Sequence, residues 1–458
     1  MKSWDGQRIV VLGAARQGQA LARYLTRHGA RVCLSDLRTE AELQAVRQSL
    51  ADLPLEWALG GHPIELLEGA DLLCLSGGVP TSLPIVQEAV RRGIPLSNDT
   101  QIFMEVVPCR TVGITGSAGK TTTTTLVGEM ARRSERHRRV FVGGNIGDPL
   151  LNYVDEMTAD DLAILEISSF QLEQMTLSPN VAAILNITPN HLDRHGTMEA
   201  YIAAKARILE FQSPQDTAVL GRDNPNAWAL RSRVRGRLIS FGWDALEEES
   251  EGTYYHEGIL YLYERRVDIP LLRRDQLLLR GDHNVLNVLA AFAIGHAAGL
   301  SLDAMLEAAE TFRGVPHRLE LVREWRGVRW YNDSIATAPE RTMAAIRSFE
   351  EPIVLLLGGR DKNLPWEDLA RLVRQRVDHV ILFGEAAEKI ERALHAVDGE
   401  RPYTIERYPN LFEAVQAAAR VAESGDVVLL SPGGTSFDEF RDFEERGERF
   451  RQWVQQLS

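Results

Sequence analysis

The glycine-rich turn from Gly116 to Thr121 is the part of the sequence best suited to hold phosphate. It follows the apolar run 111–114 and precedes a helix-length segment, in the stretch GITGSAGKTT. The backbone N–H groups of such a turn, and of the helix that follows it, point toward anionic oxygens. Lys120 is expected to reach the β- and γ-phosphates of a nucleotide, and Thr121 to offer its hydroxyl to Mg²⁺. The candidate phosphate-binding residues are Gly116, Ser117, Ala118, Gly119, Lys120, Thr121 and Thr122.

The loop departs from the commonest phosphate-binding pattern at one position. Ile114 stands where that pattern has its first glycine, so the loop is a variant. A purely structural glycine turn is the alternative interpretation. The agreement of strand, loop, lysine and threonine favours phosphate binding.

A carboxylate stands near the end of a second apolar strand. Glu166 belongs to the run DLAILEIS, residues 161–168. Acidic residues in this position lie at the ligand-binding edge of an α/β sheet. Glu166 is expected to bind Mg²⁺ directly or through water, and a salt-bridged structural role is the alternative.

An inward-facing lysine is expected on the helix that follows Thr197, a residue suited to cap a helix start. Lys205 belongs to an otherwise apolar stripe at helical spacing, formed by Met198, Tyr201, Lys205 and Ile208. From this helix alone, the lysine has three options: pairing with an acid, extending to solvent, or losing its proton through desolvation. A neutral amine can add CO₂ and become a carbamate, an anionic oxygen ligand for Mg²⁺. His191 is either a second metal ligand or a loop-packing residue.

The N-terminal segment VVLGAARQGQALARYL reads as a strand, a turn and a helix. Gly13 and Gly18 bracket the turn, and Asp36 follows a second strand at the distance typical of dinucleotide-binding folds. The middle glycine of that pattern is missing, because Ala15 occupies its place. Alone, this is a weak signal for a nicotinamide dinucleotide.

Strands of this kind must be held in a sheet. Short apolar runs alternate with helix-length segments almost throughout the chain, which predicts an α/β fold with sheets covered on both faces. Two prolines in 95–110 suggest a first linker, and Gly314 with Pro316 a second. The acidic segment 244–256 is predicted to be a solvated excursion. The expected domains are 1–105, 106–313 and 314–458.

Composition limits the partners. The 458 residues include 51 basic and 64 acidic ones, a formal net charge of −13, which argues against nonspecific nucleic-acid binding. The three cysteines match no metal or disulfide spacing, and small buried residues in a reducing compartment are expected. The sequence shows no signal-peptide pattern and no apolar run long enough to span a bilayer, so a cytoplasmic protein without membrane contact is expected.

An ordered set of motifs resembles the Mur ligases of peptidoglycan synthesis. The motifs keep one order across nearly the whole chain: TGSAGKTT, GGNIG, LEISSFQLE, NHLDRH with AYIAAKARI, GDHNVLNVLAA, VPHRLE, YNDSIATAP and LLSPGGTSFDEF. The resemblance implies a Rossmann-like N-terminal domain that binds a UDP-linked substrate, a central P-loop ATPase-type domain with a parallel sheet, and a Rossmann-like C-terminal domain that brings the amino acid. SSFQLE followed by DRH is most similar to the D-glutamate-adding branch.

The resemblance also implies the ligands and the residues that contact them. It implies ATP, two Mg²⁺ ions and a carbamate on Lys205, with Thr121, Glu166, His191 and Lys205 as metal ligands. Catalytic roles fall to Lys120, Asn145, His191, Lys205 and Arg318. Adenine, ribose and phosphate contacts fall to Asn284, Asn287, His317, Arg318 and Asp333. The uridine nucleotide is assigned to Ala15, Arg16, Gln17, Asp36, Arg38, Ser76 and Gly77. The acceptor amino acid is assigned to Thr337, Lys362, Ser436, Phe437 and Phe443.

The activity implied is ATP-dependent amide formation between UDP-N-acetylmuramoyl-L-alanine and D-glutamate through an acyl phosphate, by a monomer. Two departures from the family pattern stand out: Gly77 where the family usually has proline, and Ile335 where it has lysine. The second removes a cation near the acceptor, and Arg341 or Arg360 are candidates to replace it. L-glutamate as acceptor and a folate as acyl donor stay open, as does a P-loop switch or transport ATPase.

Overall fold

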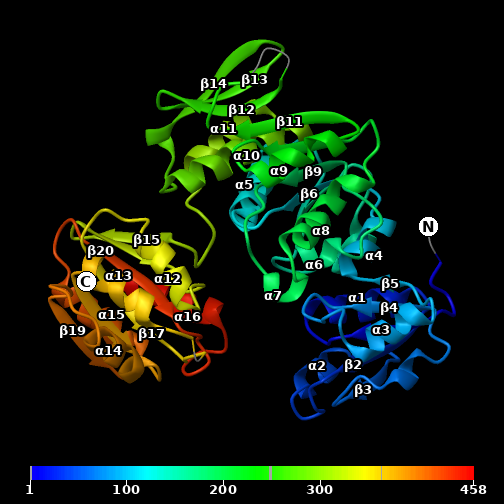
Figure 1. Ribbon diagram of the computed structural model, residues 1–458, viewed down its shortest axis with the longest axis horizontal. Helices are drawn as coiled ribbons and strands as arrows, with labels where there is room; N and C mark the ends of the chain where they lie inside the picture. The colour runs from blue at the N-terminus through cyan, green and yellow to red at the C-terminus, as the bar shows by residue number, and fades with distance from the viewer. Residues whose placement is uncertain (1–2, 247–249, 363) are drawn as a thin grey trace. The chain divides into compact units, whose positions relative to one another are not determined.

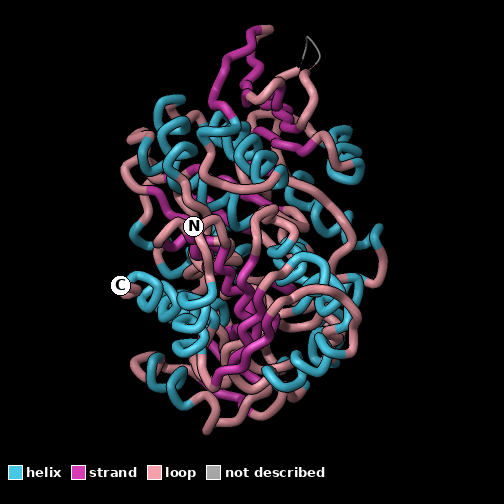
Figure 2. The backbone as a smooth tube through the Cα atoms, turned by 90° about the vertical axis from the view of Figure 1, so that its left-hand side faces the viewer, coloured by secondary structure: helices cyan, strands magenta, loops and turns pink. Residues whose placement is uncertain are grey.

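The computed structural model describes residues 3–246, 250–362 and 364–458, and they form an α/β protein with three sheets (Figure 1). By its contacts the chain divides into two compact units. The first comprises residues up to 278 together with 282–312, and the second comprises 279–281 and 313–458. Strands run between helices in both units, as the near-continuous apolar runs predict (Figure 2). Within the described residues, no helix is both long and apolar enough to cross a membrane.

The first sheet is parallel throughout, in the order β3-β2-β1-β4-β5. Its strands are β1 (Arg8–Leu12), β2 (Arg31–Asp36), β3 (Glu56–Leu59), β4 (Leu72–Leu75) and β5 (Leu96–Ser97), and its helices are α1 (Arg16–Arg27), α2 (Gln44–Ser49), α3 (Pro84–Arg91) and α4 (Asp99–Val106). The segment expected to contain a linker, 95–110, therefore folds as β5, α4 and the start of the next strand. Asn98 caps α4 by accepting a hydrogen bond from the Gln101 N–H.

The second sheet has the order β14-β13-β12-β11-β10-β9-β6-β8-β7. Its strands are β6 (Arg110–Thr115), β7 (Val140–Gly144), β8 (Leu162–Glu166), β9 (Val181–Ile184), β10 (Thr217–Gly221), β11 (Arg237–Gly242), β12 (Gly252–His256), β13 (Ile259–Glu264) and β14 (Val267–Arg273). Helices α5 (Lys120–Arg133), α6 (Ser169–Leu172), α7 (Leu192–His195), α8 (Met198–Glu210), α9 (Pro225–Ala229), α10 (Asp282–Ala298) and α11 (Leu302–Thr311) accompany it.

The prediction for 244–256 is wrong in part. Residues 252–256 form β12, which pairs in parallel with β11 and antiparallel with β13, and Thr253 is fully buried. Residues 247–249 lie outside the described residues. The acidic stretch is followed by GTYYH, a run rich in residues that favour strands, and this run forms β12 of the sheet.

The second unit contains one sheet in the order β15-β16-β20-β17-β18-β19, antiparallel only between β15 and β16. The strands are β15 (Glu320–Trp325), β16 (Val328–Asn332), β17 (Ile353–Gly358), β18 (His379–Phe383), β19 (Thr404–Tyr408) and β20 (Val427–Gly433). The helices are α12 (Pro339–Ile346), α13 (Glu367–Arg376), α14 (Ala387–His395), α15 (Leu411–Val421) and α16 (Phe443–Gln455). Leu355 and Leu356 belong to separate hydrophobic clusters, because alternate strand residues face opposite sides of the sheet.

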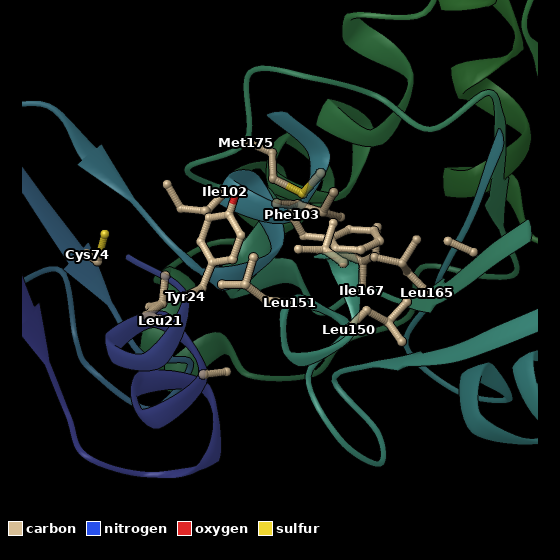
Figure 3. Close-up of a cluster of buried hydrophobic side chains, with 14 of the residues drawn as sticks. Leu21, Tyr24, Cys74, Ile102, Phe103, Leu150, Leu151, Leu165, Ile167 and Met175 are labelled. Carbon is tan, nitrogen blue, oxygen red and sulfur yellow. The ribbon is translucent and has the colours of Figure 1, made fainter. Parts of the chain in front are cut away.

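The first and second sheets share a hydrophobic core. Leu21 and Tyr24 of α1 belong to the same buried cluster as Phe103 of α4 (Figure 3). The cluster also contains Leu151 and Ile167, which lie in the connections between strands of the second sheet. This shared core explains why the first two expected domains lie in one compact unit. The boundaries expected at 105 and 313 stay a prediction.

Candidate functional site

Four neighbouring strands of the second sheet bring the predicted phosphate and metal residues to one edge. β9, β6, β8 and β7 are adjacent and parallel, so their carboxyl ends lie side by side. The loop from Gly116 follows β6, Glu166 ends β8, and Asn145 follows β7. Ligands bind at this edge in α/β sheets. The fold therefore brings together residues that are far apart in the sequence.

The phosphate loop is shaped around Gly119. This residue adopts φ +82° as the N-cap of α5, and a Cβ there would lie 2.2 Å from Asn287 Oδ1. Only glycine satisfies both conditions without strain. Lys120 Nζ donates to the Gly116 carbonyl at 2.9 Å, which curls its side chain back over the loop. Asn287 Nδ2 donates to Asn284 Oδ1 at 3.0 Å, so the two predicted nucleotide residues of α10 form a pair.

Two residues that sequence reasoning missed hold the loop from the side of β9. Asn186 Oδ1 accepts from the N–H groups of Ser117 and Ala118 at 3.1 and 2.9 Å. Tyr201 OH lies 3.0 Å from Ser117 Oγ. Asn186 follows a strand end beside the loop, which is the signal that would have identified it. For Tyr201 the sequence predicts only a place in the apolar stripe of the helix.

Glu166 connects the polar residues at the carboxyl edge of the second sheet. Its carboxylate is buried, with 2% of the residue exposed. Oε2 accepts from Thr121 Oγ1 and Oε1 from Asn145 Nδ2, each at 2.8 Å. The backbone N–H of Asn145 also donates to the Glu166 carbonyl at 2.8 Å. Three predicted site residues are therefore in direct contact, and two of them offer the oxygen ligands that Mg²⁺ prefers.

Lys205 lies inside the protein, at the start of the phosphate loop. Only 1% of the residue is exposed, so it does not extend to solvent. Its Nζ donates to the Gly116 carbonyl at 2.9 Å and to Thr115 Oγ1 at 3.3 Å, both neutral oxygens. Burial lowers the pKa of Lys205 to about 7, and the charge of Lys120 acts in the same direction while Glu166 opposes it. A substantial fraction of the amine is therefore neutral near pH 7.

His191 stands at the surface of the same unit. It caps the start of α7 at φ +53°, and its ring lies edge-on to Phe170 with 5.3 Å between centroids. The residue is exposed. Phe170 also stacks on His195 at 5.1 Å, which fixes the turn that carries His191.

The predicted uridine residues gather at the carboxyl ends of β1, β2 and β4, which are neighbours in the first sheet. Asp36 accepts from the Ala14 N–H at 2.7 Å and from Arg38 Nη2 at 2.9 Å. Burial alone would raise the pKa of Asp36, but the hydrogen bonds from Arg38 and Ala14 hold it well below its usual range. The pair fixes the turn that carries Ala15 and Arg16.

Gly77 departs from the family pattern for a visible reason. Its N–H donates to Gln17 Oε1 at 2.7 Å, and a proline there would have no N–H to donate. Gln17 and Gly77, both predicted uridine residues, are therefore bonded to each other. A pocket beside them is lined by residues of β4, its following loop, the SSFQLE segment and α7, among them Ser76, Gly77, Phe170, Gln171 and Arg194.

In the second unit, the predicted acceptor residues follow three adjacent strands. β16, β20 and β17 are parallel neighbours, and they lead into residues 333–337, 434–437 and 359–362. The Gly433 N–H donates to the Ala336 carbonyl at 2.9 Å, and Arg360 exchanges backbone hydrogen bonds with Thr435. These bonds tie the three loops to one another at a single sheet edge.

Arg446 lies beneath these loops. The side chain is fully buried, and Nε and Nη2 donate to Ser334 Oγ and the Ser334 carbonyl at 3.0 and 2.8 Å. Nη1 donates to the Gly434 carbonyl at 3.1 Å. Burial lowers the pKa of Arg446 to about 10, so the guanidinium stays charged at neutral pH. Sequence reasoning missed this residue, because FEERGERF reads as a solvated, charged helix.

Asp333 begins the loop after β16, and His317, in the segment before β15, contacts the same loop through its carbonyl, which accepts from the Ile335 N–H at 3.1 Å. Burial raises the pKa of Asp333 to about 7, while its hydrogen bond from Ser431 and the charges of Arg318 and Arg341 act in the opposite direction. His317 adopts φ +64° and lies 3.0 Å through Nδ1 from Asn332 Nδ2. The predicted nucleotide residues of this unit thus surround the end of β16.

The predicted acceptor residues differ in exposure. Lys362 is exposed and its Nζ donates to Thr337 Oγ1 at 3.3 Å. Ser436 is buried, whereas Phe437 beside it is 60% exposed. Phe443 begins α16, where its carbonyl accepts from Ser334 Oγ at 2.8 Å and its ring lies edge-on to His317. An exposed cation and an exposed aromatic ring are therefore held on rigid loops.

Three domain families match the chain in order. They are the Mur ligase MurD-like N-terminal domain over residues 7–98, the Mur ligase middle domain over 114–295, and the Mur ligase glutamate ligase domain over 317–434. A protein of Symbiobacterium thermophilum named UDP-N-acetylmuramoylalanine–D-glutamate ligase is 41% identical over 99% of this chain and 98% of its own length. The chain belongs to the Mur ligase family. A Geobacter metallireducens protein of the same name is also 41% identical, over 99% of this Mur ligase and 98% of the relative.

Solved structures share the Mur ligase fold. UDP-N-acetylmuramate-alanine ligase of Thermotoga maritima is 21% identical, with a TM-score of 0.58 over 98% of this chain and 99% of that chain. The MurF ligase of the same organism, solved in complex with ADP, gives a TM-score of 0.53 at 19% identity, over 99% and 96% of the two chains. At such identities the likeness establishes the fold of this Mur ligase and nothing finer.

Proposed function

We propose that this Mur ligase uses ATP to join D-glutamate to UDP-N-acetylmuramoyl-L-alanine in peptidoglycan precursor synthesis. The observation that carries the proposal is 41% identity, over nearly the whole chain, to relatives named for that reaction. The convergence of Lys120, Glu166 and Lys205 at one sheet edge supports it, because a phosphate loop, a buried carboxylate and an inward lysine suit acyl activation by ATP.

The reaction must turn a carboxylate into an acyl donor. The terminal carboxylate oxygen of the sugar peptide attacks the γ-phosphorus of ATP, an O–P bond forms, and the bond to ADP breaks. The amine of glutamate then attacks the acyl carbon and loses a proton, and the tetrahedral intermediate expels phosphate as the amide forms. Phosphoryl transfer depends mainly on positioning and neutralisation of charge.

The side chains divide this task. Lys120 turns from the Gly116 carbonyl to the β- and γ-phosphates, and the N–H groups of the loop bind their oxygens. Asn145, held by Glu166, orients the carboxylate that is phosphorylated. Arg318 adds positive charge, and Asn284, Asn287, His317 and Asp333 contact the nucleotide. The uridine nucleotide binds at the turn fixed by Asp36 and Arg38.

The residues present fit Mg²⁺. Thr121 and Glu166 place a hydroxyl and a carboxylate oxygen 2.8 Å apart beside the phosphate loop, and both are ligands of the kind Mg²⁺ takes. A second ion is assigned to His191 and to Lys205 in its carbamate form. When bound, the ions neutralise charge on the transferring phosphoryl group.

The burial of Lys205 supports the proposal of a carbamate. The lone pair of the neutral amine attacks the carbon of CO₂, an N–C bond forms, and a C=O electron pair moves to oxygen. One amine proton is transferred to a base, and the lysine side chain, a cation when protonated, becomes an anion. Lys205 Nζ donates to two neutral oxygens, Thr115 Oγ1 and the Gly116 carbonyl, and neither of them requires the protonated amine.

A phosphate-release assay tests the proposal. Purified protein with ATP, Mg²⁺ and UDP-N-acetylmuramoyl-L-alanine is expected to release phosphate with D-glutamate and to release little with L-glutamate or without an amino acid. Lys120→Met should abolish the signal, whereas Lys389→Met, which changes a partly exposed lysine paired with Asp361, should not.

Each other result rejects part of the proposal. Preference for L-glutamate would reject D-glutamate as acceptor, and preference for a folate donor would reject the sugar peptide. Hydrolysis that needs no substrate would favour a P-loop switch or transport ATPase. A monomeric state and a cytoplasmic location stay predictions, which sedimentation and cell fractionation would check.

A further inference from the structure

The loop after β16 lacks a cation of its own. The segment Asp333–Thr337 carries Ile335 at its centre, and Asp333 is buried at its start. An acceptor with two carboxylates needs positive charge near this loop, and Lys362 is one source of it. Arg341 and Arg360 are the two arginines that the sequence places nearby, and the structure distinguishes them.

Arg360 is already neutralised. Its Nε donates to Glu385 Oε2 at 2.8 Å in an ion pair whose members are both about half exposed. Its backbone N–H and carbonyl pair with Thr435, so the residue is also fixed by the bridge between two loops. A substrate carboxylate at this guanidinium would therefore lie close to the like charge of Glu385 and compete with it.

Arg341 is placed differently. It lies in the first turn of α12, is exposed, and donates through Nη1 to the Ile335 carbonyl at 3.4 Å. The same carbonyl accepts from the Thr337 N–H at 2.9 Å, and Thr337 Oγ1 accepts from Lys362 Nζ at 3.3 Å. Arg341 and Lys362 therefore both contact the tripeptide Ile335–Thr337. The electrostatic influence of Arg341 on Asp333 agrees with this position.

The tripeptide is rigidly supported from below. Arg446 holds the Ser334 carbonyl and hydroxyl, and the Gly433 N–H holds the Ala336 carbonyl. Arg341 of α12 and Lys362 after β17 are both exposed and reach this supported loop from two sides, so they can offer positive charge to anionic oxygens there. A guanidinium offers two parallel N–H donors to a carboxylate, which an ammonium does not.

We propose that Arg341 is a specificity-determining residue that binds one carboxylate of a dicarboxylic acceptor amino acid, while Lys362 binds the other. The inference rests on the proposed function and names the residue that replaces the cation missing at Ile335. Neutral amino acids lack the second carboxylate and are disfavoured, because one of the two cations, Arg341 or Lys362, then has no substrate carboxylate to pair with.

Steady-state kinetics of the full-length enzyme test this assignment. Arg341→Ala is expected to raise KM for D-glutamate by about 10- to 100-fold, the loss of a charge-assisted hydrogen bond, and to change KM for ATP and for the UDP substrate by less than about threefold. Arg341→Lys should recover part of the loss, because it restores charge without the paired donors. Arg360→Ala is the matched control and should leave all three KM values nearly unchanged.

Two results would overturn the assignment. One is an unchanged KM for glutamate in Arg341→Ala, and the other is an equal rise in Arg360→Ala. The thermal midpoint of both variants should match the wild type, because both side chains are exposed. If the wild type uses L-glutamate, the proposed acceptor is wrong, but the same comparison with L-glutamate still decides the role of Arg341. A wild type that ligates only a neutral amino acid would reject both proposals.

Discussion

Lys205 is the residue for which we propose the least usual chemistry, a carbamate in place of an ammonium group. Lys205→Ala is expected to lower kcat by more than about 100-fold, because an anionic metal ligand is lost, and short carboxylic acids such as acetate should restore part of the activity by entering the space left. The measurement is phosphate release with and without added acid. Lys205→Arg keeps bulk and charge, and it should be inactive and not restored. A fully active alanine variant would reject the carbamate.

The carbamate also predicts a pH dependence. The pKa of Lys205 is lowered to about 7, so the amine is mostly protonated below that pH and mostly neutral above it. At a fixed concentration of dissolved CO₂, carbamate formation should therefore rise from about pH 6 to about pH 8. Carbon-13 NMR of protein equilibrated with labelled CO₂ measures it. A signal that falls with pH, or that persists in Lys205→Arg, would contradict the assignment.

At the residue scale, sequence predicted side chains that follow from a pattern and missed those defined by tertiary contact. The apolar stripe of α8 predicted that Lys205 faces inward, and its exposure of 1% confirms this. Asn186 and Arg446 were missed, because their partners, the Ser117 N–H and the Ser334 carbonyl, lie 69 and 112 residues away in the sequence. No local spacing encodes such contacts.

The phosphate loop is the element in which backbone shape matters most. Gly119→Ala places a Cβ 2.2 Å from Asn287 Oδ1 at φ +82°, so we expect loss of nucleotide binding and a decrease of ~2 kcal/mol or more in the free energy of unfolding. Gly60→Ala is a matched control at φ +80° with open space around the new Cβ, and it should cost only ~1 kcal/mol. Isothermal calorimetry and urea unfolding measure the two effects. Normal nucleotide affinity in Gly119→Ala would refute the expectation.

Helix α16 supports the acceptor loops through Arg446. Arg446→Met should lower the free energy of unfolding by ~3 kcal/mol, because the Ser334 and Gly434 carbonyls lose their charged donor inside the protein. Arg449→Met, on the exposed side of the same helix, should change it by less than ~0.5 kcal/mol. Chemical unfolding followed by fluorescence compares them. Equal stability of the two variants would show that Arg446 does not hold the loops.

At the element scale, the sequence predicts the buried strands better than the segments that connect them. Runs such as DLAILEIS are apolar at nearly every position, and a strand buried on both faces requires this. The position of Glu166 at the end of such a run also predicted that it lies at the ligand-binding edge of a sheet. The segment 95–110, in which two prolines suggest a linker, contains helix α4, and the segment 244–256, predicted to be a solvated excursion, contains β12. In both cases tertiary packing outweighed local composition.

At the scale of the whole molecule, each of the two compact units has hydrophobic clusters of its own. The buried cluster that joins the first and second sheets runs from Trp4 to Leu230, whereas the two clusters of the second unit lie within residues 328–457. The α/β fold class, and the succession of three sheets along the chain, could be predicted from the motifs. The core shared by α1, α4 and the second sheet could not, because it depends on how two sheets pack together (Figure 3).

Separate cores predict separate unfolding. Differential scanning calorimetry of the intact chain is expected to show two transitions, because the contacts that stabilise each unit lie mostly inside it. Arg446→Met should lower the midpoint of one transition by several degrees, and Gly119→Ala should lower the midpoint of the other. Each variant serves as the control for its counterpart. A single transition that both substitutions shift equally would mean that the two units unfold as one cooperative body, and the separation of their cores would then have no thermodynamic consequence.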